Sequence, residues 1–174
     1  MEQTSWEKAV AFHGHRCPGL AIGVRAALVL QQLWQIRRAE DEDLVCITEN
    51  DACGVDGIQA LLGCTMGKGN LLYHGTGKMA FSFYDRKNGR SCRLYLKAQR
   101  GIRSREEYQE YLLHGPQEEI FSIGEVRTAL PERARLFASR VCEVCGEAAP
   151  EHKMRLQEGK VVCLDCFSTY DRGW

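Results

Sequence analysis

Residues 12–30, FHGHRCPGLAIGVRAALVL, decide the fold, because a long apolar segment begins within them at a proline. Pro18 lacks an amide hydrogen, and the first turn of a helix leaves that hydrogen unused. Mostly apolar residues continue from there to about Arg38, without the clean polar stripe of a surface helix. The sequence therefore predicts a long, central and buried helix that starts directly after Cys17.

The same stretch places two histidines and a cysteine within five residues, His13, His15 and Cys17. The N-terminus of a helix carries a partial positive charge, which lowers the pKa of a cysteine there and favours its thiolate. Imidazole and thiolate groups are also ligands that suit Zn, Ni or Fe. The cluster is therefore a candidate metal site or thiol site. The alternative is that it only starts a helix, with Cys17 as a buried structural thiol.

A second cysteine has the same predicted setting. Residues 44–48, LVCIT, indicate a strand, residues 51–54 a turn, and residues 55–62 a helix, so Cys53 lies just ahead of a helix start. We expect Cys17 and Cys53 to approach each other, with both helix N-termini directed at one spot.

Two adjacent thiolates repel each other unless a cation, a disulfide or protonation relieves the repulsion. One solution is a divalent metal, Zn or Ni, bound by Cys17 and by histidine. His13 and His15 lie two residues apart, so in an extended segment both would face the same spot. The other solution is a reversible Cys17 to Cys53 disulfide with the histidines as proton carriers.

The rest of the main domain alternates short strands and helices. LLYHG, KMAFSFY and RSCRLYL, all within residues 71–96, are predicted strands, and Asn88-Gly89 is a hairpin turn. A capping box at Ser104 starts a further helix. The predicted class is therefore α+β, with a long buried helix and an antiparallel sheet. Arg93 and Lys97 would form a cationic strand face, either solvated or lining a groove for a phosphate-bearing ligand or single-stranded RNA.

The loop GCTMGKGN, residues 63–70, is similar to a phosphate-binding loop without matching one. A Walker pattern needs a glycine at position 62 and a serine or threonine at position 69, so a P-loop NTPase is excluded. The glycines and Lys68 either form an anion-binding nest or only connect to the next strand.

Four cysteines near the C-terminus have the spacing of a structural zinc site. Two CxxC pairs enclose 17 residues, and four thiolates fill the coordination tetrahedron of zinc; the ligands are Cys142, Cys145, Cys163 and Cys166. Two predicted strands lie between the pairs, and FSTYDRGW would add a terminal helical turn. This indicates a zinc ribbon or treble-clef-like domain. We place a core domain at residues 1–138 and the zinc domain at residues 139–174.

Composition narrows the classes of function. The chain of 174 residues has 23 basic and 23 acidic residues, and this balance argues against a general nucleic-acid binder. The charged opening MEQTSWEKAV and the lack of a long apolar run predict a cytoplasmic protein without a membrane segment. In a reducing compartment, nine cysteines are better explained as metal ligands, reactive thiols or core residues than as disulfides.

Three segments, FHGHRCPGLAIGVRAA, ENDACGVDGIQALLGCTMGKGNL and GKMAF, resemble the FmdE family of formylmethanofuran dehydrogenase proteins. CEVCGE and CLDC are similar to the zinc module of many members. The resemblance implies an α+β core with an appended zinc domain, and a homodimer. It also implies that His13, His15, Cys17 and Cys53 line a shared site, with Cys64 and Lys68 nearby as second-rank, cofactor-binding residues.

Two functions from different classes follow. The first is an accessory redox or metal-site protein for a molybdenum or tungsten enzyme, with His15 and Cys17 among the ligands of a second Zn or Ni. Because the chain has no ferredoxin-like iron-sulfur pattern and no visible pterin-binding machinery, it would be an accessory component, and its own catalysis stays open. The second is a zinc-ribbon module that contacts a partner protein or RNA without catalysis.

Overall fold

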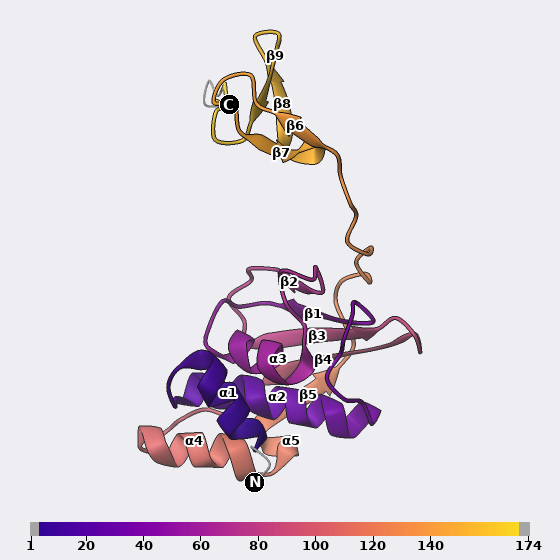
Figure 1. The fold of residues 1–174 in the computed structure, drawn as a ribbon. Coiled ribbons are helices and arrows are strands. Elements are labelled where there is room, and N and C mark those ends of the chain that lie inside the picture. Colours follow the sequence, from indigo (N-terminus) through magenta and orange to yellow (C-terminus); the bar gives the residue numbers. More distant parts are fainter. Residues whose placement is uncertain (1–3, 171–174) are drawn as a thin grey trace. The chain divides into compact units, whose positions relative to one another are not determined.

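The computed structural model describes residues 4–170. It divides the chain into two compact units, with the division between Ala134 and Arg135 (Figure 1). Each unit has its own strands, and the first contains all the α-helices of the described residues. No helix within residues 4–170 is long and apolar enough to cross a membrane.

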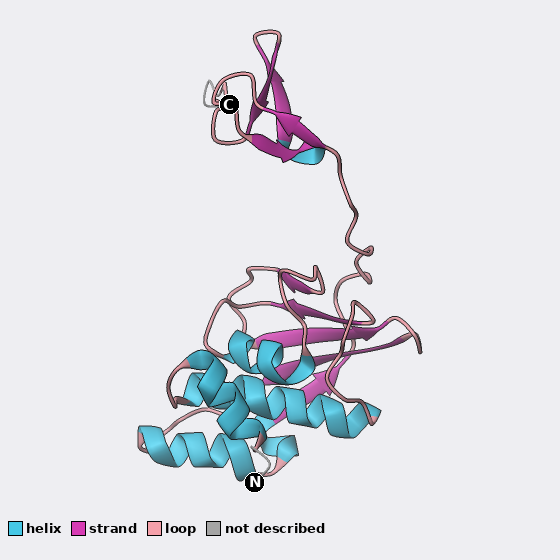
Figure 2. Ribbon diagram, in the orientation of Figure 1, coloured by secondary structure: helices cyan, strands magenta, loops and turns pink. Residues whose placement is uncertain are grey.

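The first unit confirms the predicted α+β class. Its helices cover one face of a five-stranded sheet (Figure 2). The helices are α1 (Ser5–His13), α2 (Pro18–Trp34), α3 (Gly54–Leu62), α4 (Arg105–His114) and α5 (Gln117–Ile120). The strands are β1 (Leu44–Thr48), β2 (Leu71–Tyr73), β3 (Ala80–Asp85), β4 (Arg90–Leu96) and β5 (Phe121–Gly124).

The sheet is mixed rather than purely antiparallel. Its strand order is β2-β1-β3-β4-β5, with β1 and β2 parallel and the other pairs antiparallel. On the helix-covered face, Phe81, Phe83 and Leu94 are fully buried in the main core. On the opposite face, Val45, Ile47 and Tyr84 form a smaller buried cluster.

The α2 helix begins where the sequence predicts. Pro18 is its first residue, and Cys17 is its N-cap, with an extended backbone and a sulfur that accepts a hydrogen bond from the Leu20 amide at 3.3 Å. The helix ends at Trp34, before the predicted end near Arg38. It stops there because Gln35 takes a left-handed conformation, with φ of 52°, and caps the last turn.

Glycines bring α2 and α3 into backbone contact. A methyl group on Gly23 would lie only 1.8 Å from the carbonyl oxygen of Gly54, and one on Gly57 would lie 2.6 Å from the Val24 amide nitrogen. Larger residues at these positions would push the helices apart. The close contact places the N-terminus of α2 beside that of α3.

A buried ion pair between Glu49 and Arg93 attaches the start of the loop between β1 and α3 to strand β4. Glu49 and Arg93 are each 7% exposed, and the guanidinium of Arg93 donates to both carboxylate oxygens, at 2.5 and 3.0 Å. The bonds from Arg93 are the main cause that lowers the pKa of Glu49. The predicted cationic strand face is therefore wrong at Arg93, whose charge is neutralised inside the protein.

Asn70 fixes the loop at residues 63–70. Its buried amide accepts a hydrogen bond from the Thr65 amide at 2.9 Å and donates to the Leu44 carbonyl at 2.8 Å. The loop is thus held against β1.

The second unit consists of two small hairpins. Its elements are β6 (Ser139–Val141), β7 (Ala148–Pro150), the 3-10 turn η1 (Glu151–Lys153), β8 (Met154–Gln157) and β9 (Lys160–Cys163). The antiparallel pair β8-β9 contains the two strands predicted between the CxxC pairs. The predicted terminal helical turn does not form in residues 167–170, and its remainder, residues 171–174, lies outside the described residues.

The glycine contact generates a stability prediction. We expect Gly23→Ala to lower the free energy of unfolding by about 3 kcal/mol or more, because the added methyl group overlaps backbone that cannot move without separating two core helices. Gly67→Ala is the matched control, since nothing lies within 4 Å of its added methyl group. Urea unfolding followed by circular dichroism measures both changes. Equal stability of the two variants would contradict the close contact.

Candidate metal centres

Three ligand groups converge at the N-termini of α2 and α3. The ligand atoms of His13, Cys17 and Cys53 all lie within 4.8 Å of one another. The Nε2 atom of His13 is 3.8 Å from the sulfur of Cys17. A tetrahedral zinc ion with ordinary bond lengths would separate such a nitrogen and sulfur by about 3.6 Å. The donor set and its spacing therefore fit a single zinc-like ion.

Asp56 orients the imidazole of this cluster. The Nδ1 atom of His13 is 2.7 Å from one carboxylate oxygen of Asp56, and Gln59 donates to the other oxygen at 3.1 Å. A proton on Nδ1 leaves the lone pair of Nε2 directed at Cys17. This carboxylate-histidine arrangement is the usual support of a metal-bound imidazole.

Asp56 is a site residue that the sequence reasoning missed. A signal for it exists in DACGVD, because an acid three residues after Cys53 shares a face with it once α3 forms. The histidine it contacts, however, is 43 residues earlier in the chain. Local spacing alone does not reveal that pairing.

The two thiols of the cluster differ in access. Cys17 is only 3% exposed, whereas Cys53 is half-buried and lines a neighbouring cavity. Burial first, and then the charge of Cys17, raise the pKa of Cys53. The repulsion between the two thiolates is therefore relieved by a cation, a disulfide or protonation, as expected from the sequence. Cys53, rather than Cys17, is the thiol that small reagents reach.

His15 does not join the cluster. His13 ends α1, and Gly14 reverses the chain with φ of 94°, so the segment is not extended as expected. The exposed ring of His15 instead packs against His13 at a tilt of 38°, with 4.4 Å between ring centroids. The structure thus brings His13, and not His15, to Cys17.

Cys64 and Lys68 lie at the other end of α3, away from the cluster. The buried thiol of Cys64 donates to the Leu44 carbonyl, and burial raises its pKa to about 12. The ammonium of Lys68 donates to the carbonyls of Ala39 and Glu40, at 3.3 and 3.4 Å. The expectation that these two residues lie near the shared site is not met, because the length of α3 separates them from it.

Two further cysteines, Cys46 and Cys92, lie in the core with Cys64. Burial raises the pKa of Cys92 to about 12 and that of Cys46 well above its usual value, with the nearby Cys64 and Cys92 adding to the effect on Cys46. These thiols stay protonated near neutral pH and serve as small apolar core residues.

A cavity of about 470 Å³ lies next to the Cys/His cluster. His13, Cys53 and Asp56 form one side of it. The rest of the cavity wall comes mostly from α3, β2 and the loop before β2. Its residues include Val55, Met66, Leu72 and Tyr73. A small molecule in this cavity would reach the cluster directly.

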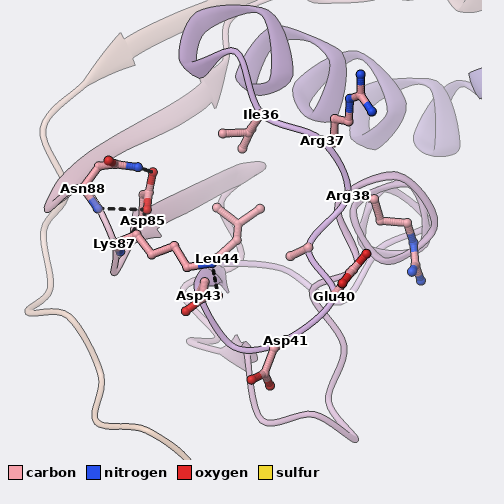
Figure 3. A pocket seen from close by; sticks show the side chains of 11 residues that line it. Ile36, Arg37, Arg38, Glu40, Asp41, Asp43, Leu44, Asp85, Lys87 and Asn88 are labelled. Carbon is pink, nitrogen blue, oxygen red and sulfur yellow. Dashed lines mark hydrogen bonds and ion pairs between the residues drawn. The ribbon is translucent and has the colours of Figure 1, made fainter.

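A second cavity of about 390 Å³ lies between the loop after α2 and the β3-β4 hairpin (Figure 3). Two of its charged groups form an ion pair, Lys87 with Asp43 at 2.7 Å, and Asn88 donates to Asp85 at 2.7 Å. Neither cysteine nor histidine lines it. It therefore offers less metal or thiol chemistry than the cavity beside Cys53.

The four cysteines of the second unit form a closed ligand set. Their sulfur atoms lie within 4.8 Å of one another, and those of Cys145 and Cys163 are 3.9 Å apart. Four sulfurs around one zinc ion would be separated by about 3.8 Å. Backbone amides, including those of Cys145 and Cys163, lower the pKa of Cys142 to about 6. Cys142 is therefore the thiol of this set that most readily becomes a thiolate, whereas the neighbouring thiols raise the pKa of Cys166 to about 12.

Loss of one of these ligands tests the structural role of zinc. We expect Cys142→Ser to unfold residues 135–170 while the first unit stays folded, because the second unit buries little besides Cys142 and Val162. Hydrogen exchange measured by mass spectrometry would show lost protection only in the second unit. Full protection of β8 and β9 in the variant would contradict this role.

Comparison with known proteins agrees with the division of the chain into two units. Residues 12–128 match the family model described as "FmdE, Molybdenum formylmethanofuran dehydrogenase operon", and residues 135–172 match the prokaryotic dksA/traR C4-type zinc finger. The second unit is therefore a four-cysteine zinc finger, which supports a structural zinc ion at the four thiolates.

Two relatives extend the comparison over nearly the whole chain. A tungsten formylmethanofuran dehydrogenase FmdE-like protein from Syntrophus aciditrophicus matches 92% of this chain and 88% of its own, with a TM-score of 0.65 and 28% identity. A probable S-adenosyl-L-methionine-binding protein of Archaeoglobus fulgidus is 30% identical over 94% of this chain. The chain spans only about half, 52%, of that curated relative. With its core matched over residues 12–128, the chain belongs to the FmdE family.

Proposed function

We propose that the first unit binds a second divalent metal ion, Zn²⁺ or Ni²⁺, through His13, Cys17 and Cys53. The observation that carries this proposal is the imidazole of His13, held by Asp56 with its Nε2 atom facing Cys17. A histidine that served only the core would not need this orientation toward two thiols. The resulting site would be separate from the zinc finger.

The residues at the site have distinct roles. Cys17 and Cys53 would bind as thiolates, and His13 would bind through Nε2 while Asp56 keeps the proton at Nδ1. When bound, the metal would supply a Lewis-acid centre with one coordination position left for water or a ligand. Cys53, on the wall of the 470 Å³ cavity, brings that position within reach of a small molecule.

In the cell, the protein would act as an accessory metal-site or redox protein of a molybdenum or tungsten enzyme. Membership of the FmdE family supports this role. The two cysteine-containing ligand sets found within residues 4–170 suit single ions, so the pterin chemistry of formylmethanofuran dehydrogenase would lie on a partner protein. A homodimer and a cytoplasmic location belong to the same proposal. From the name of the Archaeoglobus relative, S-adenosylmethionine is among the ligands that the cavity would take.

Metal content separates this function from the alternative of a zinc module that only contacts a partner protein or RNA. We expect two metal ions per wild-type chain, and one per chain in both Cys142→Ser and Cys53→Ser. Cys92→Ala is the control and should keep two, because Cys92 lies outside both ligand sets. Plasma emission spectrometry on protein purified without chelators measures the ratio. One ion in the wild type, lost in Cys142→Ser, would favour the alternative.

The support given by Asp56 has its own test. We expect Asp56→Ala to weaken metal binding at the core site by about 10–100-fold, because the imidazole loses the partner that fixes its proton and orientation. Asp51→Ala is the matched control: Asp51 lines the same cavity but does not contact His13, so its replacement should leave metal affinity nearly unchanged. Competition with a fluorescent chelator measures both affinities. An equal loss in the two variants would refute the orienting role.

A further inference from the structure

We infer that the cavity beside the Cys/His cluster binds a neutral or positively charged organic ligand with an apolar or aromatic body, and that Asp51 discriminates against anionic ligands there. The inference deepens the proposed function, because it concerns the molecule that would occupy the open side of the metal site. It rests on what lines the cavity and on which of its polar groups are already bonded.

The shape and the apolar surface come from a few side chains. Val55, Leu71 and Leu72 form apolar wall, and Tyr73 and Met66 are 58% and 74% exposed. An aromatic ring and a thioether that are left this open provide a surface for a flat or aliphatic group. A cavity of about 470 Å³ is in the range that small organic ligands occupy.

The charges in the cavity are negative or neutralised. No lysine or arginine lines it, whereas Asp51 and Asp56 both do. The positive N-terminus of α3 is the remaining source of positive charge, and Cys53 and Asp56 occupy its cap and first turn. Two thiolates would balance the charge of a divalent metal. A ligand with a net negative charge would therefore meet no lysine or arginine in the cavity wall to compensate it.

Most polar groups of the wall are already used. The carboxylate of Asp56 bonds to His13 and Gln59. The hydroxyl of Thr48 donates to the backbone carbonyl of Asn50. The side chain of Asn50 bonds to the backbone of Ala52 and Lys78. Asp51 is exposed, and no residue in the described range 4–170 donates a hydrogen bond to its carboxylate. Asp51 is thus the acid that remains available to a cationic or hydrogen-donating group of the ligand.

Three matched probes test the charge preference on the full-length, zinc-loaded protein. Each is a benzyl mercaptan, whose thiol can bind the metal, with an aminomethyl, a methyl or a carboxylate group in the para position. By calorimetry, we expect the aminomethyl probe to bind about tenfold more tightly than the carboxylate probe, because attraction and repulsion at Asp51 act in opposite directions. The affinity of the methyl probe should lie between those of the other two.

Two variants assign that preference to one residue. In Asp51→Asn, the ratio of the affinity for the aminomethyl probe to the affinity for the carboxylate probe should fall to about threefold or less. Asp41→Asn, which removes an acid from the other cavity, should leave the ratio unchanged. Tighter binding of the carboxylate probe, or a ratio that Asp51→Asn does not alter, would overturn the inference.

Metal analysis of the same samples keeps the two proposals distinguishable. Absence of the core metal would count against the proposed function alone. The methyl thioethers of the three probes, which have no thiol to bind a metal, then test the charge order in the same cavity. The same order among the thioethers would uphold the inference, and a reversed or absent order would overturn it.

Discussion

The glycine contact between α2 and α3 is the constraint on which the site depends. Gly23 and Gly57 allow two backbones to touch, and the touching segments lie within a turn or two of both helix starts. Gly19 extends the contact to the cluster itself, since a methyl group there would lie 3.1 Å from the Cβ atom of Cys53. Side chains of ordinary size would separate Cys17 from Cys53. The same small residues that pack the core therefore set the distance between the two thiols.

Patterns among neighbouring residues predicted those features of the fold that depend on neighbouring residues alone. Pro18 marked the start of α2 because a proline ring suits the first helical turn, and the CxxC pairs marked the zinc finger because their spacing is itself the ligand geometry. Gly14 shows the limit of this approach. Its left-handed turn moved His15 out of the cluster, and an extended segment was an equally reasonable expectation for HGH.

Pairing between residues far apart in the chain explains the remaining differences between the sequence-based expectations and the structure. Arg93 alternates with apolar residues as a solvent-facing strand residue would, yet it binds Glu49, 44 residues away in the chain. Asp56 and His13 meet in the same way, across 43 residues. Such pairs depend on how strands and helices are assembled, and the spacing within one segment contains no information about them. The class of the fold was therefore predictable, while the groups that orient the site were not.

The burial of Cys46, Cys64 and Cys92 bears on how the protein would respond to oxidants. Oxidants attack thiolates, and burial keeps these three sulfurs protonated and out of reach. Of the nine cysteines in the chain, the other six belong to the two ligand sets. Damage by peroxide would therefore fall first on the sulfurs of these two sets, and in the zinc finger its early sign would be release of zinc rather than loss of the core.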